Sequence, residues 1–215
     1  MNVLAIAHRA GNSLAGLHAA NTLGADVIEC DVHERRGQLE VRHLKTAGPL
    51  PFLWDRWELA SASAPRLGLL ELLEADRHAT LFMLDLKGRR TSAARAIADL
   101  LHQSGRDRPV MVCGRHWPSV DVLAELPFVL PVLSARNRLE LSQLRERVRS
   151  SRVHGVSVHR SLLTSEIVVE LRASVELVMT WPVNDLDLLQ STLGIGCNGV
   201  ISDEPTVLQA LLSSR

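Results

Sequence analysis

The sequence VIECDVHERRGQLEVRH, residues 27–43, begins as an apolar run of strand type and yet contains Glu29 and Asp31. Side chains two residues apart on a strand point to the same face, so the two carboxylates share one side of this element. A turn at Gly37 follows, and the next residues predict a returning strand that brings His43 back toward the carboxylates. The stretch therefore predicts a strand with two charges on one face and a hairpin built on its end.

Short apolar runs recur along the whole chain and alternate with segments whose apolar residues have helical spacing. There are eight such runs: VLAIAH (3–8), VIECDV (27–32), LFMLDLK (81–87), VMVC (110–113), FVLPVL (128–133), HGVSV (154–158), ELVMTW (176–181) and GVISD (199–203). Alternating strands and helices favour a parallel sheet, and eight units fit a closed (β/α)8 TIM barrel of the α/β class. The alternative is an open doubly wound sheet, whose usual glycine-rich nucleotide loops follow none of the runs.

The length of 215 residues suits one large domain, so we expect a single domain over residues 1–215. The longest stretch without a clear pattern, residues 44–66, contains Trp54 and Trp57. Loops of about 20 residues in compact domains are usually functional. We expect this one to remain irregular beside the short hairpin extension that follows the second strand.

The composition limits the partners. Lysine plus arginine equals aspartate plus glutamate at 24 each, so no overall field would hold the protein on nucleic acid or an anionic membrane. No run approaches the ~18 apolar residues of a membrane span, and we expect no stable membrane insertion. The three cysteines lie far apart, which argues against disulfides and a cysteine zinc site. We expect a cytoplasmic protein that acts on a small molecule.

Three carboxylates lie near the ends of predicted strands, where the active groups of such barrels lie. Glu29, Asp31 and Asp85 would converge at one mouth and repel one another unless a cation lay between them. An all-oxygen ligand set suits Mg²⁺ or Ca²⁺ better than zinc, so we expect one divalent cation of that kind. The alternative is that each is an ordinary solvated or salt-bridged group.

Two histidines have positions beside this predicted metal site. His8 ends the first run, and His43 ends the hairpin return. Imidazoles titrate near neutrality, so one can accept a proton while the other donates one. Arg9 and Lys87 add positive charge at the same mouth. The set suits a phosphodiester and indicates metal-assisted phosphoryl chemistry.

Longer motifs extend over essentially the whole chain. AHRAGNSLAGLHAANTLGADVIECDV is similar to the pattern AHRG…ENTLAAF…A…GAD.IE.DV, LEVRH to VV.HD, APRLGLLELL to iPtLeelL, MTWPVND to WTVND, and GCNGVISDEP to GvDGIITD.P, while MLDLKG stands where the pattern has IEIK. In these motifs the chain resembles the glycerophosphodiester phosphodiesterase family of the metal-dependent phosphodiesterase barrels.

The resemblance implies hydrolysis of a glycerophosphodiester to a phosphomonoester, glycerol 3-phosphate, and an alcohol. It implies the following roles: His8 and His43 as the general acid and base, Glu29, Asp31 and Asp85 as metal ligands, Arg9 and Lys87 as phosphate contacts, and Trp181 as a lining residue of the substrate pocket. Trp181 is equally well explained as a packing residue of the barrel rim. Asp203 is expected to support the rim through hydrogen bonds.

The chain departs from the family pattern around these residues. The first loop is about five residues shorter than the family's, and Ala10 replaces a glycine, which calls for ordinary backbone there. Asp85 stands where glutamate is commoner, and Leu44 replaces the aspartate after His43. These changes leave the predicted catalytic residues in place and put the substrate in doubt. An aspartate at the third metal position also resembles the spider-type phospholipase D toxins, which are secreted and depend on disulfides.

Two alternative functions stay open. The apolar stretch PLPFLWDRW could form a lip for an acyl chain, which would make the protein a lysophospholipase D-type enzyme, or Trp54 and Trp57 could simply pack the loop onto the barrel. The chain could also be a catalytically weak protein that binds a phosphate ligand on the same fold.

Overall fold

The eight predicted strands form one closed parallel barrel. The computed structural model describes residues 3–47, 50–55, 58–105 and 108–215. Within these ranges the barrel strands are β1 (Leu4–Ala7), β2 (Val27–Arg35), β7 (Leu81–Leu86), β8 (Val110–Gly114), β9 (Val129–Ala135), β10 (Gly155–His159), β11 (Leu177–Trp181) and β12 (Gly199–Ser202). Each overlaps a predicted apolar run, and β2 continues three residues beyond its run.

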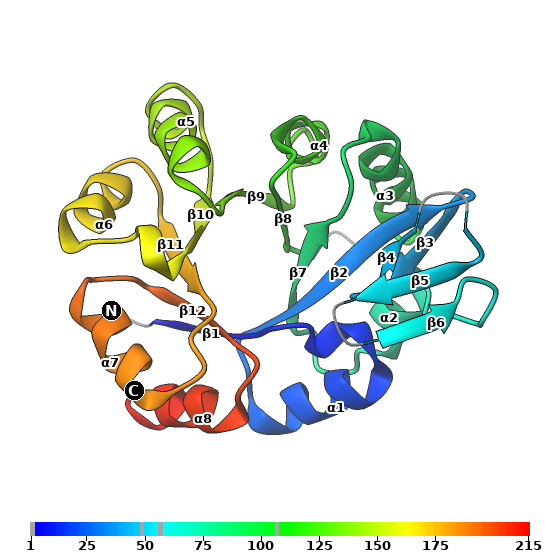
Figure 1. Cartoon of the computed structure of the whole chain (residues 1–215), viewed down its shortest axis with the longest axis horizontal. Helices are drawn as coiled ribbons and strands as arrows, with labels where there is room; N and C mark the ends of the chain where they lie inside the picture. The colour runs from blue at the N-terminus through cyan, green and yellow to red at the C-terminus, as the bar shows by residue number, and fades with distance from the viewer. Residues whose placement is uncertain (1–2, 48–49, 56–57, 106–107) are drawn as a thin grey trace.

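The barrel closes through β1. This strand pairs in parallel with β12, Leu4 opposite Gly199, and also with β2, Ile6 opposite Val27. The remaining neighbours follow the chain in order around the ring (Figure 1). The closed barrel is thereby confirmed, and the open doubly wound sheet is excluded.

Helices cover the outside of the ring, as expected for a TIM barrel. In the described ranges they are α1 (Leu14–Leu23), α2 (Leu69–Ala75), α3 (Thr91–Gln103), α4 (Trp117–Leu123), α5 (Arg138–Ser150), α6 (Ser165–Arg172), α7 (Leu186–Gly194) and α8 (Pro205–Ser213). The main core lies between these helices and the outward faces of the strands, and Cys30 and Val32 of β2 belong to it. No helix within the described ranges is both long and apolar enough to cross a lipid bilayer.

The inside of the barrel is a second, smaller core. Its buried members are Ile6, Val27, Met83, Met111, Cys113, Val132, Leu177, Met179 and Ile201. In β2 the inward positions that follow Val27 are Glu29 and Asp31, which are also buried. At the carboxyl end of the barrel, the apolar inner core therefore gives way to buried carboxylates.

The region after β2 differs from the expectation. A hairpin joins β2 to β3 (Gln38–Val41), with Val32 opposite Val41. The prediction that residues 44–66 are irregular is wrong, because this stretch contains a three-stranded antiparallel sheet. We call this the small sheet; it consists of β4 (Lys45–Thr46), β5 (Phe52–Asp55) and β6 (Glu58–Ser61).

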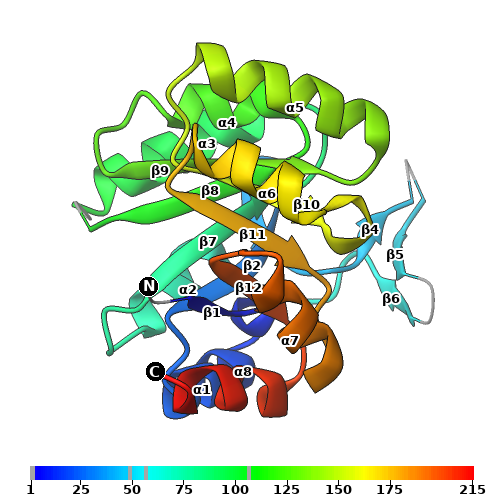
Figure 2. The same ribbon diagram turned by 90° about the vertical axis from the view of Figure 1, so that its left-hand side faces the viewer.

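Apolar packing explains why the small sheet forms. Leu44, Leu53 and Ala62 form a buried cluster of their own, separate from the barrel cores. The sheet projects at the carboxyl end of the barrel, away from the two termini (Figure 2). Trp57 lies outside the described residues. The small sheet therefore lies at the same end of the barrel as the predicted site.

An ion pair ties the end of the chain to the barrel and gives a test of stability. Asp26 accepts a hydrogen bond from the Ala5 amide at 2.6 Å and one from Arg215 at 2.9 Å. Partial burial would raise the pKa of Asp26, but the Arg215 and Ala5 hydrogen bonds outweigh it and lower the pKa below its ordinary 3.8. The carboxylate therefore stabilises the fold above about pH 4, and the contribution disappears as the pH falls through the lower folded-state pKa.

Replacing Asp26 by asparagine should lower the free energy of unfolding at pH 7 by about 1–2 kcal/mol, since Arg215 then donates to a neutral amide oxygen instead of a carboxylate. The difference from the natural chain should shrink below about pH 3. Urea unfolding at both pH values measures it. Asp99→Asn, on the exposed face of α3, is the control and should change little. A deficit that stays constant with pH would contradict the assignment.

Candidate metal and phosphodiester site

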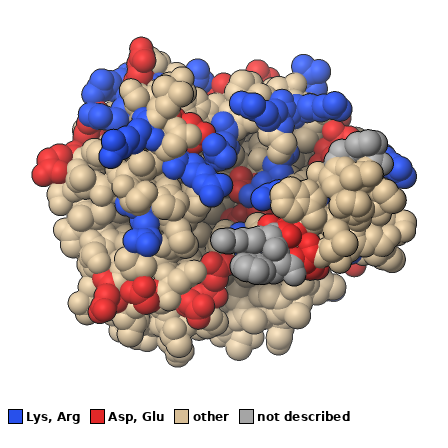
Figure 3. Space-filling view, viewed as in Figure 1, with Lys and Arg blue, Asp and Glu red and all other residues tan. Residues whose placement is uncertain are grey.

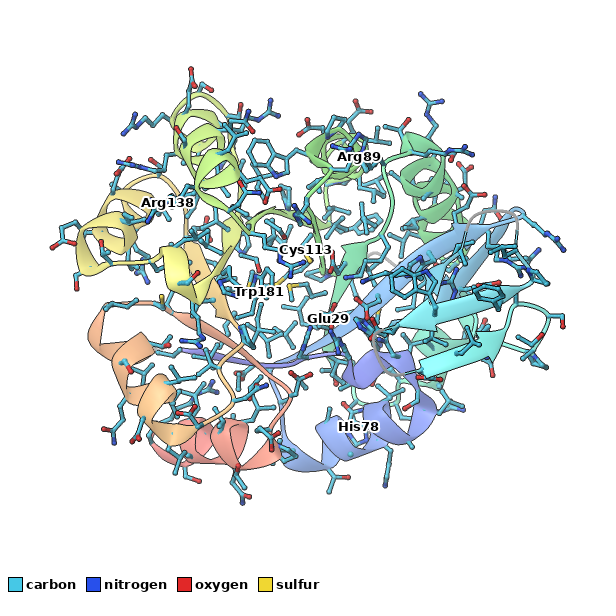
Figure 4. All side chains as sticks on the ribbon, viewed as in Figure 1. Glu29, His78, Arg89, Cys113, Arg138 and Trp181 are labelled. Atoms are coloured by element: carbon cyan, nitrogen blue, oxygen red, sulfur yellow. The ribbon has the colours of Figure 1, made fainter. Side chains whose placement is uncertain are left out.

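The predicted site residues lie at the carboxyl end of the barrel. Figure 4 shows Glu29, Cys113 and Trp181 inside the ring of strands and Arg138 outside it. A separate hollow of about 270 Å³ lies at the opposite end, between the first residues of β7 and β8, and is lined mainly by apolar side chains. None of the predicted site residues lines that hollow.

Three carboxylates form the centre of the site. Asp31 in β2 lies directly opposite Asp85 in the neighbouring β7, and Glu29 lies one inward position below Asp31. One oxygen of each lies within 4.8 Å of the others. Glu29 is 2 % exposed and Asp31 is 1 % exposed. The alternation and the parallel register therefore bring together the three residues predicted as metal ligands.

The pKa values of the two buried carboxylates are shifted in opposite directions. Burial, reinforced by the charge of Asp31, raises the pKa of Glu29 to about 7. Burial also acts to raise the pKa of Asp31, but hydrogen bonding to His43 and the charge of Lys87 outweigh it and lower the pKa. Like charges this close cannot both ionise freely. The cluster is short of positive charge.

Lys87 supplies part of that charge. Its ammonium contacts Asp85 and lies 2.5 Å from Asp31 Oδ1. Burial would lower the pKa of Lys87, but Asp85 and Asp31 outweigh it and raise the pKa. Asp31 Oδ1 is thus buried against the Lys87 ammonium.

The donor set fits a divalent cation. Three carboxylate oxygens from two adjacent strands meet there, and the ammonium of Lys87 can balance a single negative charge. Hard cations such as Mg²⁺ and Ca²⁺ prefer such oxygen ligands. The residues that would hold the ion are therefore Glu29, Asp31 and Asp85.

The loop after β1 donates hydrogen bonds to the carboxylates of β2. Arg9 adopts a left-handed backbone conformation with φ of 56°, and its amide donates to Glu29 Oε2 at 2.6 Å. Asn12 donates to Asp31 Oδ2 at 2.7 Å and accepts from the Asp31 amide at 2.8 Å. A Cβ on Gly11 would lie 2.8 Å from the Cys30 Cβ, so only glycine lets the loop lie this close to β2.

This loop contains both expected and missed features. Ala10 has ordinary backbone, as expected, because the positive φ falls on Arg9 instead. The Arg9 guanidinium lies 4.0 Å from Asp31 at the mouth, and its contact with phosphate stays a prediction. Sequence reasoning missed Asn12, which it treated only as part of a loop motif. No pattern in the sequence marks Asn12, because its role depends on how closely this loop approaches β2.

His8 is backed by a carboxylate. Its Nδ1 lies 2.7 Å from Asp203 Oδ1, and Asn184 donates to the other oxygen of Asp203 at 3.0 Å. Burial raises the pKa of Asp203, but the hydrogen bond and charge of His8, the Asn184 hydrogen bond and the charge of Arg9 together outweigh it and lower the pKa to about 2. An ionised carboxylate only accepts, so His8 Nδ1 carries the hydrogen and Nε2 is left for a ligand.

The same contact changes the acidity of His8. Burial lowers the pKa of His8, but the hydrogen bond to Asp203 and the charge of Glu29 outweigh it, and the net shift is upward. Asp203 thus supports the rim through hydrogen bonds, as expected, and does so at a predicted catalytic residue.

His43 lies on the other side of the cluster. The hairpin return brings its Nδ1 to 3.2 Å from Asp31 Oδ2, and its Nε2 lies 2.8 Å from Asp55 Oδ2. Asp55 ends β5 of the small sheet, and sequence reasoning gave it no role. The two predicted acid/base residues therefore lie beside different carboxylates of the cluster, His8 beside Glu29 and His43 beside Asp31.

Trp181 ends β11 across the barrel mouth. Its ring meets that of His159 edge-on at 5.1 Å, and it packs against the inner core of the barrel. Burial, then the charges of Arg160 and Arg136, lower the pKa of His159. Lysine and arginine side chains border the upper side of a hollow with carboxylates at its floor (Figure 3). Trp181 thus lies on the rim at a basic side of the mouth, and its role as a lining residue of the substrate pocket stays a prediction.

Metal binding gives the test of the carboxylate cluster. Replacing Asp85 by asparagine removes one anionic ligand and should weaken Mg²⁺ or Ca²⁺ binding by more than about 10-fold. Isothermal calorimetry should give one bound ion per natural chain and the same affinity for the Asp99→Asn control. Equal affinities for the natural chain and Asp85→Asn would remove Asp85 from the site.

Comparisons with known proteins place the fold. No family model matches the sequence, and no curated protein matches it. A structure from Silicibacter pomeroyi, provisionally assigned as a glycerophosphoryl diester phosphodiesterase, is 16 % identical with a TM-score of 0.81, over 99 % of this chain and 94 % of its own. An Oleispira antarctica phosphodiesterase in complex with the product sn-glycerol-3-phosphate is 19 % identical with a TM-score of 0.78, over 98 % and 96 %.

A glycerophosphodiester phosphodiesterase from Thermotoga maritima is 17 % identical with a TM-score of 0.75, over 100 % of this chain and 99 % of its own. Identities this low establish the fold alone. Over its whole length the chain therefore has the fold of glycerophosphodiester phosphodiesterase structures.

Proposed function

We propose that the protein is a divalent-metal-dependent phosphoric diester hydrolase that acts on a glycerophosphodiester. The products would be a phosphomonoester, glycerol 3-phosphate, and an alcohol. The observation that carries the proposal is the carboxylate cluster of Glu29, Asp31 and Asp85 with one histidine beside each end, His8 near Glu29 and His43 near Asp31. The product bound in the Oleispira antarctica structure supports the same substrate class.

The chain's own residues suggest how the reaction would proceed. Arg9 and Lys87 would hold the non-bridging phosphate oxygens, because both carry positive charge at the cluster. A bound divalent cation would supply charge that polarises the phosphodiester and neutralises the three carboxylates. One of His8 and His43 would take a proton from the attacking water or hydroxyl, and the other would protonate the oxygen of the leaving alcohol.

The surroundings fit a small anionic substrate. The chain has no net charge, so attraction of the phosphate must come from local groups at the mouth. The three cysteines are buried and free, which fits the expected cytoplasmic setting. Trp181 would line the pocket on the side opposite the carboxylates.

Purified protein should hydrolyse glycerophosphodiesters, lose the activity with EDTA and regain it with Mg²⁺ or Ca²⁺. His8→Ala and His43→Ala should each reduce kcat by about 10² to 10⁴, since each removes a proton carrier. Phosphorus NMR of the products should show glycerol 3-phosphate.

His78→Ala is the matched control, because His78 is exposed and lies outside the ring of strands (Figure 4). Near-normal turnover by both site variants would refute the two roles. Binding of the cation without turnover of any glycerophosphodiester would instead favour the phosphate-binding protein.

A second candidate is a lysophospholipase D-type activity. Trp54 is 43 % exposed and Leu59 is 70 % exposed, and the two are paired across β5 and β6, so they share one face of the small sheet. That face lies at the carboxyl end of the barrel and could hold an acyl chain. Lys45 lies over the Trp54 ring at 5.4 Å on the same face.

Substrate preference separates the two candidates. If the small sheet holds an acyl chain, the double variant Trp54→Ser, Leu59→Ser should raise KM for lysophosphatidylcholine by about 10-fold or more and leave glycerophosphocholine unaffected. Steady-state kinetics with both substrates measures this. Turnover of glycerophosphocholine but not of lysophosphatidylcholine by the natural chain would reject the lipid candidate.

A further inference from the structure

We propose that Asp55 of the small sheet is the positioning residue for His43 and fixes which imidazole nitrogen faces the substrate. This inference rests on the proposed function, because it assigns a partner to one of the two proton carriers. It also gives the small sheet a role, namely to supply a carboxylate from outside the barrel.

The contact geometry distinguishes the two nitrogens of His43. Nε2 lies 2.8 Å from Asp55 Oδ2, whereas Nδ1 lies 3.2 Å from Asp31 Oδ2. Asp31 Oδ2 already accepts the shorter bond from Asn12, at 2.7 Å. The stronger partner of His43 is therefore Asp55, and the nitrogen that faces the carboxylate cluster is Nδ1.

This arrangement mirrors that of His8 with the nitrogens exchanged. Asp203 holds Nδ1 of His8 and leaves Nε2 for the substrate, while Asp55 holds Nε2 of His43 and leaves Nδ1. A carboxylate behind a catalytic imidazole fixes its tautomer and ring orientation. Each proton carrier thus has one nitrogen on a carboxylate outside the metal cluster and the other toward the site, where His43 Nδ1 also meets Asp31.

The local structure holds Asp55 in place. Leu44, next to His43, packs against Leu53 of β5, so the residue after the histidine anchors the strand that ends in Asp55. Arg42, on the other side of His43, is 4 % exposed, and its guanidinium donates to Thr46 in β4 at 3.3 Å. Both neighbours of His43 therefore attach the small sheet to the site.

The chain departs from the family pattern at this same point. The pattern has aspartate directly after the histidine, and here that residue is Leu44. With its side chain buried in the small-sheet cluster, residue 44 provides packing instead of charge. Asp55 brings a carboxylate to the histidine from a different segment, and its second oxygen lies 3.8 Å from the Lys45 ammonium.

Two measurements on the full chain test the proposal. Nitrogen-15 NMR at a pH where His43 is neutral, with Mg²⁺ present, should show the hydrogen on Nε2 in the natural chain and a shift toward Nδ1 in Asp55→Ala. In kinetics, Asp55→Ala should lower kcat by about 10- to 100-fold with little change in KM. Asp55→Asn keeps an acceptor and should retain the Nε2–H tautomer.

A double-mutant cycle separates positioning from a purely structural role. In a His43→Ala background, Asp55→Ala should cause no further loss, because its effect passes through the imidazole. Glu58→Ala is the matched control: Glu58 lies opposite Asp55 in β6, is exposed, and should change neither the tautomer nor kcat.

An undiminished effect of Asp55→Ala in the His43→Ala background, or an unchanged tautomer, would overturn the proposal. If the natural chain hydrolyses no phosphodiester, the proposed function fails, yet the tautomer measurement still decides whether Asp55 positions His43.

Discussion

Mutual repulsion among buried carboxylates is the constraint around which the mouth of this barrel is built. Two of them, Glu29 and Asp31, are almost fully buried on one face of β2, and Asp85 joins them from β7. Uncompensated charges in such a place are strongly unfavourable. The surrounding groups partly offset this cost. They are the Arg9 amide, the Asn12 side chain, the Lys87 ammonium and one nitrogen of His43, which all face the cluster. The remaining deficit of positive charge is what a divalent cation would remove.

The barrel and the carboxylate cluster could be predicted from sequence because both depend on short-range periodicity. A short apolar run of four to eight residues that is bounded by turn residues and alternates with helical segments favours a buried strand. Alternation then decides that Glu29 and Asp31 share a face with Val27 and that Cys30 faces the helices. The parallel register of adjacent strands places Asp85 beside Asp31. No contact between distant residues had to be known for these steps.

The partners of the two histidines could not be predicted in the same way. Asp203 meets His8 across 195 residues, and Asp55 meets His43 through a sheet whose strands have only two to four residues. Strands that short carry too little alternation to be recognised, so residues 44–66 were expected to be irregular. Asn12 was missed because its role depends on how closely the loop at Gly11 approaches β2. These features arise from tertiary packing, which one sequence does not display.

The most direct test of the shared cation site is a crystal structure of the protein with Mn²⁺, in which anomalous scattering locates the ion. If Glu29, Asp31 and Asp85 hold one cation, a single peak should lie about 2.0–2.6 Å from an oxygen of each, with the Lys87 ammonium displaced from at least one of the aspartates. A mouth without a peak, with Lys87 still between Asp31 and Asp85, would show that the lysine itself neutralises the cluster. That result would contradict the metal site on which the proposed chemistry depends.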